Sequence, residues 1–241
     1  MLPAKERLIF ALDVADKAAA WRHLELLKNE VGLFKVGLEL YLAEGAGFLQ
    51  NLTDKLGPQK VFLDLKLYDI PATVLGALKT ITTGVALVTV PSDLGPTGLK
   101  KIVAGTAHNV LAVTVLTSNA AADLQTLGYK PEYTENLTRL VVDRAKMAQD
   151  AGCRGVVCSG REAAAVRKAC GENLLVVCPG IRPDWGEVAG DDQRRIVTPY
   201  EAIRNGADYI VVGRPIRAAS DQVAAARRVA AEIARGLQDR A

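Results

Sequence analysis

The sequence is poor in the residues that most protein metal sites use. Its 241 residues include only four cysteines and two histidines, and no two cysteines have CxxC spacing. We therefore do not expect a zinc site built from cysteine and histidine. Cys158 and Cys178 lie inside apolar runs, where free cysteine usually acts as a small core residue.

The chain also lacks strong net charge and long hydrophobic runs. Its formal net charge is +3, its basic residues are scattered, and 5% of its residues are aromatic, so nothing favours nucleic-acid binding. No apolar run approaches the ~18 residues of a membrane span. The first residues, "MLPAKERLIFALDVADK", carry acidic groups where a signal peptide needs an apolar segment. We expect a soluble, cytoplasmic protein.

What the sequence does contain is a regular alternation of short apolar runs and amphipathic stretches. The runs predict eight strands, at residues 7–14, 33–40, 61–69, 85–92, 110–118, 155–160, 174–181 and 209–215. Strands that alternate with helices pair in parallel through right-handed crossovers. Eight such units predict a (β/α)₈ TIM barrel, with residues 1–241 as a single domain. An open doubly wound sheet is the alternative, but no GxGxxG follows the first run.

One predicted strand, "VFLDLKLYDI" (61–70), carries three charges within six residues. Alternation places three leucines on one face and Asp64 and Lys66 together on the other. Asp69 has the opposite parity to Asp64, so it need not point into its own barrel. Taken alone, the run fits either an active site or a surface strand with an ion pair worth about 0–1 kcal/mol.

Polar side chains recur at the ends of the other predicted strands. In TIM barrels, catalytic residues lie at the carboxyl ends of the strands, so we expect these side chains to gather at one rim. They are Asp13, Lys35, Asp64, Lys66, Thr117, Ser118, Ser159, Arg182 and Arg214.

Two segments near the end of the chain predict a phosphate site. "VVGRPI" (211–216) places Gly213 and Arg214 after the eighth strand, where backbone N–H groups and a guanidinium can bind phosphate. The alternative is that Arg214 pairs with a surface carboxylate. Residues 182–197 form a long, glycine-punctuated loop, which predicts a lid from which Gln193 could reach a phosphate. A loop without contacts is the alternative there.

Seven motifs together resemble one known family. "ALDV", "FKVGLEL", "DLKLYDIP", "VLTS", "PGIRP", "DQRRI" and "GRPI" occur in order between about residues 7 and 217, and they are similar to the motifs of the orotidine 5′-phosphate decarboxylases. The pattern DxKxxDI alone is shared with a wider superfamily of barrel decarboxylases and lyases. The sequence departs from the family pattern at Ala72, where asparagine is usual, and at Pro91, where histidine is common.

The resemblance implies the chemistry and the site. Orotidine 5′-phosphate would be decarboxylated to UMP and CO₂ in de novo pyrimidine biosynthesis, without cofactor or metal. Lys66 would stabilise and protonate a C6 carbanion, within a charged array of Lys35, Asp64 and Asp69. The resemblance also implies a homodimer in which Asp69 and Thr73 act across the interface.

The substrate contacts implied by the resemblance divide the pocket into parts. The ribose would meet Asp13, Lys35 and the partner's Thr73, and Ser159 would contact the pyrimidine amide. Thr117 and Pro179 would line the pocket, and the phosphate region would include Arg182, Gln193, Gly213 and Arg214.

Two other functions remain open. A Mg²⁺-dependent sugar-phosphate lyase of the same superfamily would typically carry a glutamate where Lys35 stands. A non-catalytic nucleotide-binding barrel would keep the pocket but not the turnover.

Overall fold

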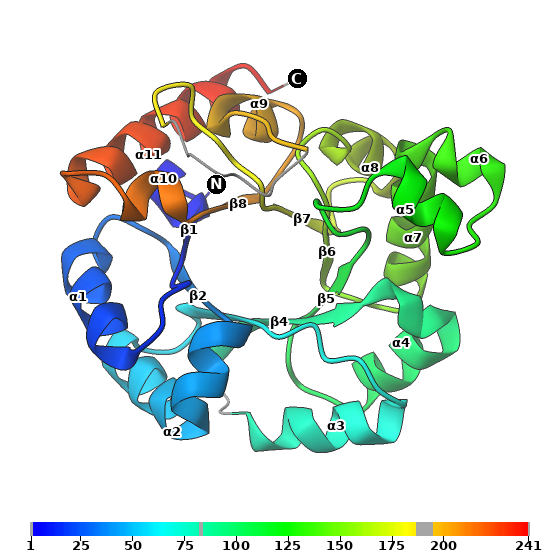
Figure 1. Ribbon diagram of the computed structural model, residues 1–241, viewed down its shortest axis with the longest axis horizontal. Helices are drawn as coiled ribbons and strands as arrows, with labels where there is room; N and C mark the ends of the chain where they lie inside the picture. Colours follow the sequence, from blue (N-terminus) through cyan, green and yellow to red (C-terminus); the bar gives the residue numbers. More distant parts are fainter. Residues whose placement is uncertain (1, 82–83, 187–194, 241) are drawn as a thin grey trace.

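The chain folds into a closed barrel of parallel strands surrounded by helices, as the sequence predicts (Figure 1). The computed structural model describes residues 2–81, 84–186 and 195–240. The strands follow one another around the barrel in sequence order: β1 Leu8–Ala11, β2 Leu33–Gly37, β3 Val61–Asp64, β4 Val85–Pro91, β5 Val110–Val113, β6 Gly155–Val157, β7 Leu175–Cys178 and β8 Tyr209–Val212.

Helices follow the strands and form the outer layer of the barrel (Figure 1). They are α1 Lys17–Leu27, α2 Leu38–Leu56, α3 Pro71–Thr80, α4 Gly95–Ala104, α5 Ala121–Thr126, α6 Pro131–Thr134, α7 Leu137–Asp150, α8 Ala163–Cys170, α9 Pro199–Arg204, α10 Arg214–Arg217 and α11 Gln222–Gln238, with 3₁₀ turns η1 Ala4–Arg7 and η2 Ser92–Leu94. Among the described residues, no helix is long and apolar enough to cross a membrane.

The strands begin where the sequence predicts, within one residue, but most of them end three to five residues early. The predicted strand 61–69, for example, is a strand only to Asp64, and 110–118 only to Val113. At these ends the chain leaves the hydrogen-bonded ladder and turns toward the next helix. Most of the polar residues predicted at strand ends therefore lie on the loops just beyond them, which gives their side chains more freedom of direction.

Two apolar cores hold the barrel and position its mouth. Side chains that alternate along the strands, such as Ile9, Phe62 and Val177, are buried inside the barrel. The intervening residues, such as Phe10 and Leu63, pack outward in a larger cluster that includes side chains of the helices. Because strand side chains alternate, the residue two positions after Phe62 shares its inner side. That residue is Asp64, so the strand pattern itself directs a carboxylate into the mouth.

Helix ends fix where the loops at the mouth begin and end. α9 starts with a capping box: the Thr198 hydroxyl accepts from the Glu201 backbone N–H at 3.1 Å, and the Glu201 carboxylate accepts from the Thr198 N–H at 2.9 Å. The Thr198 backbone N–H holds the pKa of Glu201 below its ordinary value.

Cys158 and Cys178 are buried in the outer core, which confirms their predicted place.

Candidate active site

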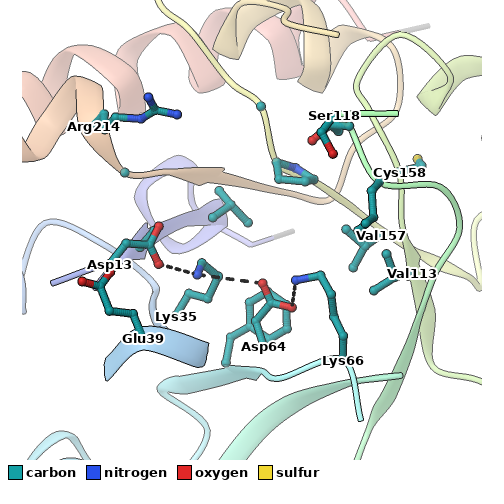
Figure 2. A pocket seen from close by; sticks show the side chains of 18 of the residues that line it. Asp13, Lys35, Glu39, Asp64, Lys66, Val113, Ser118, Val157, Cys158 and Arg214 are labelled. Atoms are coloured by element: carbon teal, nitrogen blue, oxygen red, sulfur yellow. Dashed lines mark hydrogen bonds and ion pairs between the residues drawn. The ribbon is translucent and has the colours of Figure 1, made fainter. Parts of the chain in front are cut away.

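A pocket of about 400 Å³ opens at the carboxyl ends of the strands. It gathers most of the residues that the sequence predicts there, from segments far apart in the chain (Figure 2). The predicted residues that line it are Asp13, Lys35, Asp64, Lys66, Thr117, Pro179, Arg182, Gly213 and Arg214. The structure therefore brings carboxylates, ammonium groups and guanidinium groups to one cavity.

Four of these side chains form a row of alternating charge. Lys35 Nζ lies 2.7 Å from Asp13 Oδ1 and 3.8 Å from Asp64 Oδ2, and Lys66 Nζ lies 2.9 Å from Asp64 Oδ1 (Figure 2). The Lys35 and Asp64 side chains are only 11% and 16% exposed, so each charge needs its partner to offset lost hydration. Lys66 ends the row and is 33% exposed, toward the pocket. Its ammonium group is thus held on one side and open on the other.

The backbone of Lys66 adopts an uncommon conformation that aims this ammonium group. Its φ is 50°, in the left-handed region that costs a non-glycine residue about 1–3 kcal/mol. Thr89 of β4 stabilises the turn, because its hydroxyl accepts from the Lys66 backbone N–H at 2.9 Å and donates to Asp64 Oδ1 at 3.0 Å. Strain that the surroundings hold in place is typical of functional sites.

Gly37, at the end of β2, makes room for the charged row. A Cβ at this position would lie 2.9 Å from Lys35 Nζ and 3.2 Å from Asp13 Oδ1. A larger residue would therefore push these two groups apart or out of the pocket. In the sequence "KVGLEL", Lys35 thus provides the cation and Gly37 leaves the space for it.

Three predicted residues lie outside the pocket wall. Asp69 and Thr73 are exposed, and the Asp69 carboxylate accepts from the Ile70 backbone N–H at 2.6 Å. The Ser159 side chain is fully buried: its hydroxyl donates to the Arg195 carbonyl at 3.1 Å and accepts from the Arg161 backbone N–H at 3.2 Å. Because both contacts turn Ser159 away from the cavity, it does not line the pocket.

Part of the predicted loop and phosphate site falls on residues that the structure does not describe. Gln193 lies outside the described residues, as do the other positions from 187 to 194. The lid over residues 182–197 therefore stays a prediction.

Sequence reasoning missed several residues that line the pocket or support it. Glu39 and Arg217 line the pocket, whereas Ser118, which also lines it, was expected at this rim. Within the described part of the chain, the Arg217 guanidinium has no hydrogen-bond or ion-pair partner. Its place three residues after Arg214 could have been noticed, because this spacing puts both side chains on one helix face. Thr89 could also have been found, as the polar residue inside the apolar run "VALVTVP".

A parallel eight-stranded barrel with charged side chains at the carboxyl ends of its strands is the architecture of a TIM-barrel enzyme. Comparisons with known proteins identify the family. Residues 6–229 match the model of the orotidine 5′-phosphate decarboxylase / HUMPS family. The chain belongs to this family.

The relatives are similar in sequence over nearly the whole chain. An orotidine 5′-phosphate decarboxylase of Desulfosudis oleivorans is 47% identical over 97% of this chain and 95% of its own. One from Anaeromyxobacter sp. is 48% identical over 95% of this chain and 98% of its own. The crystal structure of orotidine 5′-phosphate decarboxylase from Lactobacillus acidophilus superposes with a TM-score of 0.79 at 32% identity, covering 94% of this chain and 98% of that one.

Proposed function

We propose that this protein decarboxylates orotidine 5′-phosphate to UMP and CO₂, in the cytoplasmic synthesis of pyrimidine nucleotides. The observation that carries the proposal is the row Asp13–Lys35–Asp64–Lys66, which ends in an ammonium group open to the pocket. The family and the names of the relatives support the same reaction.

The chemistry explains why a fixed cation is needed. When the bond between C6 and the carboxylate carbon breaks, CO₂ leaves and the electron pair stays on C6, where the ring delocalises it poorly. Lys66 Nζ, held 2.9 Å from Asp64 Oδ1, would stabilise this charge and then donate its proton to C6. The resulting amine regains a proton from water. One preorganised donor supplies about 2.7–4 kcal/mol.

Asp64 has a second role in this proposal. It is mostly buried and lies beside Lys66, so the substrate carboxylate would approach a charge of its own sign. The repulsion is relieved when neutral CO₂ leaves. Lys35, 2.7 Å from Asp13 and 3.8 Å from Asp64, holds both carboxylates in place.

The phosphate would bind on the side of the pocket away from Lys66, where Arg214 lies (Figure 2). Arg182, Arg214 and Arg217 all line the cavity, and guanidinium groups match phosphate oxygens in pairs. α10 has only four residues, so the side chains rather than a helix terminus would hold the phosphate. Binding energy from this remote group can be used to position the reacting ring.

We also propose the homodimer, because several large apolar side chains beside Asp69 and at the start of α2 are exposed. Leu38 and Leu42 are large, exposed side chains at the start of α2, and Tyr68 and Ile70 are exposed between β3 and α3. A patch of this kind is typical of a protein interface. If a second copy covers it, Asp69 and Thr73 would reach the partner's pocket and complete the charged array, which would explain why neither lines its own.

An absorbance assay tests the proposed reaction. When purified protein is mixed with orotidine 5′-phosphate in the presence of EDTA, the orotidylate absorbance should fall as UMP forms. Chromatography identifies the UMP. Activity that EDTA abolishes would point to the lyase, and the ion-paired Lys35 argues against a metal at that position. UMP binding without any loss of absorbance would indicate a non-catalytic nucleotide-binding barrel.

A further inference from the structure

A buried ion pair lies behind the pocket wall, outside the charged row. Arg195 Nη1 contacts Glu162 Oε1 at 3.1 Å, and the two side chains are 8% and 5% exposed. Glu162 precedes α8, and Arg195 lies in the segment that leads to α9. Neither residue lines the pocket.

The same guanidinium also binds the backbone of residues 115–118, the part of the pocket wall that follows β5. Arg195 Nη2 donates to the backbone carbonyls of Val115 at 3.0 Å and Leu116 at 2.9 Å. These residues line the pocket and are followed directly by Thr117 and Ser118, which line it too. This wall, residues 115–118, belongs to no helix or strand, so hydrogen bonds from elsewhere must fix its position.

The backbone around Arg195 is fixed to two other strands. Its carbonyl accepts the Ser159 hydroxyl, just beyond β6, at 3.1 Å. Two residues later, the Val197 carbonyl accepts from the backbone N–H of Arg182, just beyond β7, at 2.9 Å. Arg195 thus connects the wall 115–118 with the segment that holds Arg182, one of the guanidinium groups of the pocket.

Stability alone does not account for this arrangement. Arg195 Nε and Glu162 Oε2 are buried and have no hydrogen-bond partner among the described residues. Burial raises the pKa of Glu162 although Arg195 opposes the change, so hiding this carboxylate is costly. A buried ion pair with unpaired atoms is often no more stable than an apolar replacement. The position in which the ion pair holds the surrounding backbone therefore explains its presence better than its contribution to stability does.

We propose that Arg195 is a positioning residue, which holds the wall 115–118 at a fixed place relative to Arg182. In the proposed nucleotide complex, which this inference assumes, Arg182 would lie at the phosphate end and Thr117 elsewhere along the same ligand. Arg195 would then set the spacing between two parts of the pocket without touching the substrate. Misplacement by about 1 Å can cost an enzyme about a hundredfold in rate.

The chain offers a closely matched control at the opposite end of the barrel. Arg167 is 10% exposed, pairs with Asp208 at 2.6 Å and donates to the backbone carbonyls of Leu174 at 3.0 Å and Gly206 at 2.9 Å. Asp208 and Leu174 immediately precede β8 and β7, away from the mouth. Lysine in place of either arginine keeps the charge but cannot bind the carboxylate and both carbonyls in the same way.

The test compares Arg195→Lys with Arg167→Lys in the full chain. We expect Arg195→Lys to lower kcat/KM for orotidine 5′-phosphate by about ten- to hundredfold, while Arg167→Lys lowers the melting temperature comparably and leaves kcat/KM close to wild type. An Arg195→Lys enzyme with wild-type kcat/KM would overturn the proposal. Equal losses in both variants would do so too, because they would indicate general loosening.

Amide hydrogen exchange tests the same idea without any ligand. In Arg195→Lys, amides of residues 115–118 and of Arg182 should exchange faster, and in Arg167→Lys they should not; unchanged exchange in Arg195→Lys would refute the anchoring. If Arg195→Lys does not fold, Glu162→Gln gives the same readout, since Arg195 then loses its charged partner. Should the wild-type protein fail to turn over orotidylate, the proposed function falls, and the exchange result still decides on Arg195.

Discussion

Replacing Lys66 with alanine removes the ammonium group at the open end of the charged row. Asp64 Oδ1 would lose the contact at 2.9 Å but keep the Thr89 hydroxyl at 3.0 Å, and Lys35 would still lie 3.8 Å from Oδ2. The carboxylate therefore stays in place, without the cation that would face C6. Asp64 is only 16% exposed, so the loss of this charged hydrogen bond should cost about 1.5–3 kcal/mol of stability.

The effect on turnover should be larger than the effect on stability. A preorganised charge is worth about 2.7–4 kcal/mol, or about 10²–10³-fold in kcat. Loss of a general acid costs about 10²–10⁴-fold. Because effects of groups that act together do not add, we expect kcat to fall by at least about 10³-fold. UMP lacks the reacting carboxylate, so its dissociation constant should change little.

Stopped assays of orotidylate absorbance give kcat, and calorimetric titration with UMP gives the dissociation constant. Lys60→Ala is the control, because Lys60 immediately precedes β3 and pairs with Glu6 at 2.8 Å, at the other end of the same strand. It should keep wild-type turnover. Near-normal turnover in Lys66→Ala, or an equal loss in Lys60→Ala, would refute the assignment of Lys66.

Arg214→Ala should weaken UMP binding by about ten- to hundredfold for each charged hydrogen bond lost and leave uridine binding unchanged; an unaltered UMP dissociation constant would place the phosphate elsewhere. Ile70→Lys, within the exposed apolar patch, should produce a monomer in sedimentation experiments and reduce activity, whereas Leu127→Lys, an exposed leucine at the end of α5, should do neither; a fully active Ile70→Lys monomer would contradict the shared site. Hydrogen bonds from Lys28 and Lys55 lower the pKa of Glu25 from 4.5 to about 2, so this group stabilises the fold above its ordinary pKa and the gain disappears as the pH falls through about 2. The melting temperature of wild type minus that of Glu25→Gln should therefore shrink on acidification and in high salt, and a constant difference would disprove the linkage.

The barrel and the location of its site can be predicted from the sequence alone. Most strand starts are readable because an apolar run begins there directly after a polar residue or a glycine. The alternation around Phe62 directs Asp64 inward whatever the rest of the chain does. Eight repeats of one unit leave few ways to close a sheet. Charged groups such as Asp13 and Arg214, placed just after a strand, then had to meet at one mouth.

The directions of the side chains beyond the strands depend on contacts between distant parts of the chain. The left-handed turn at Lys66 depends on Thr89, 23 residues away, and the wall before Thr117 depends on Arg195, 80 residues from Val115. Ser159 turns away from the pocket because its hydroxyl binds a carbonyl 36 residues along the chain. Hydrogen bonds between such distant residues leave no periodic pattern in a sequence, because they depend on where the closed barrel brings its loops together.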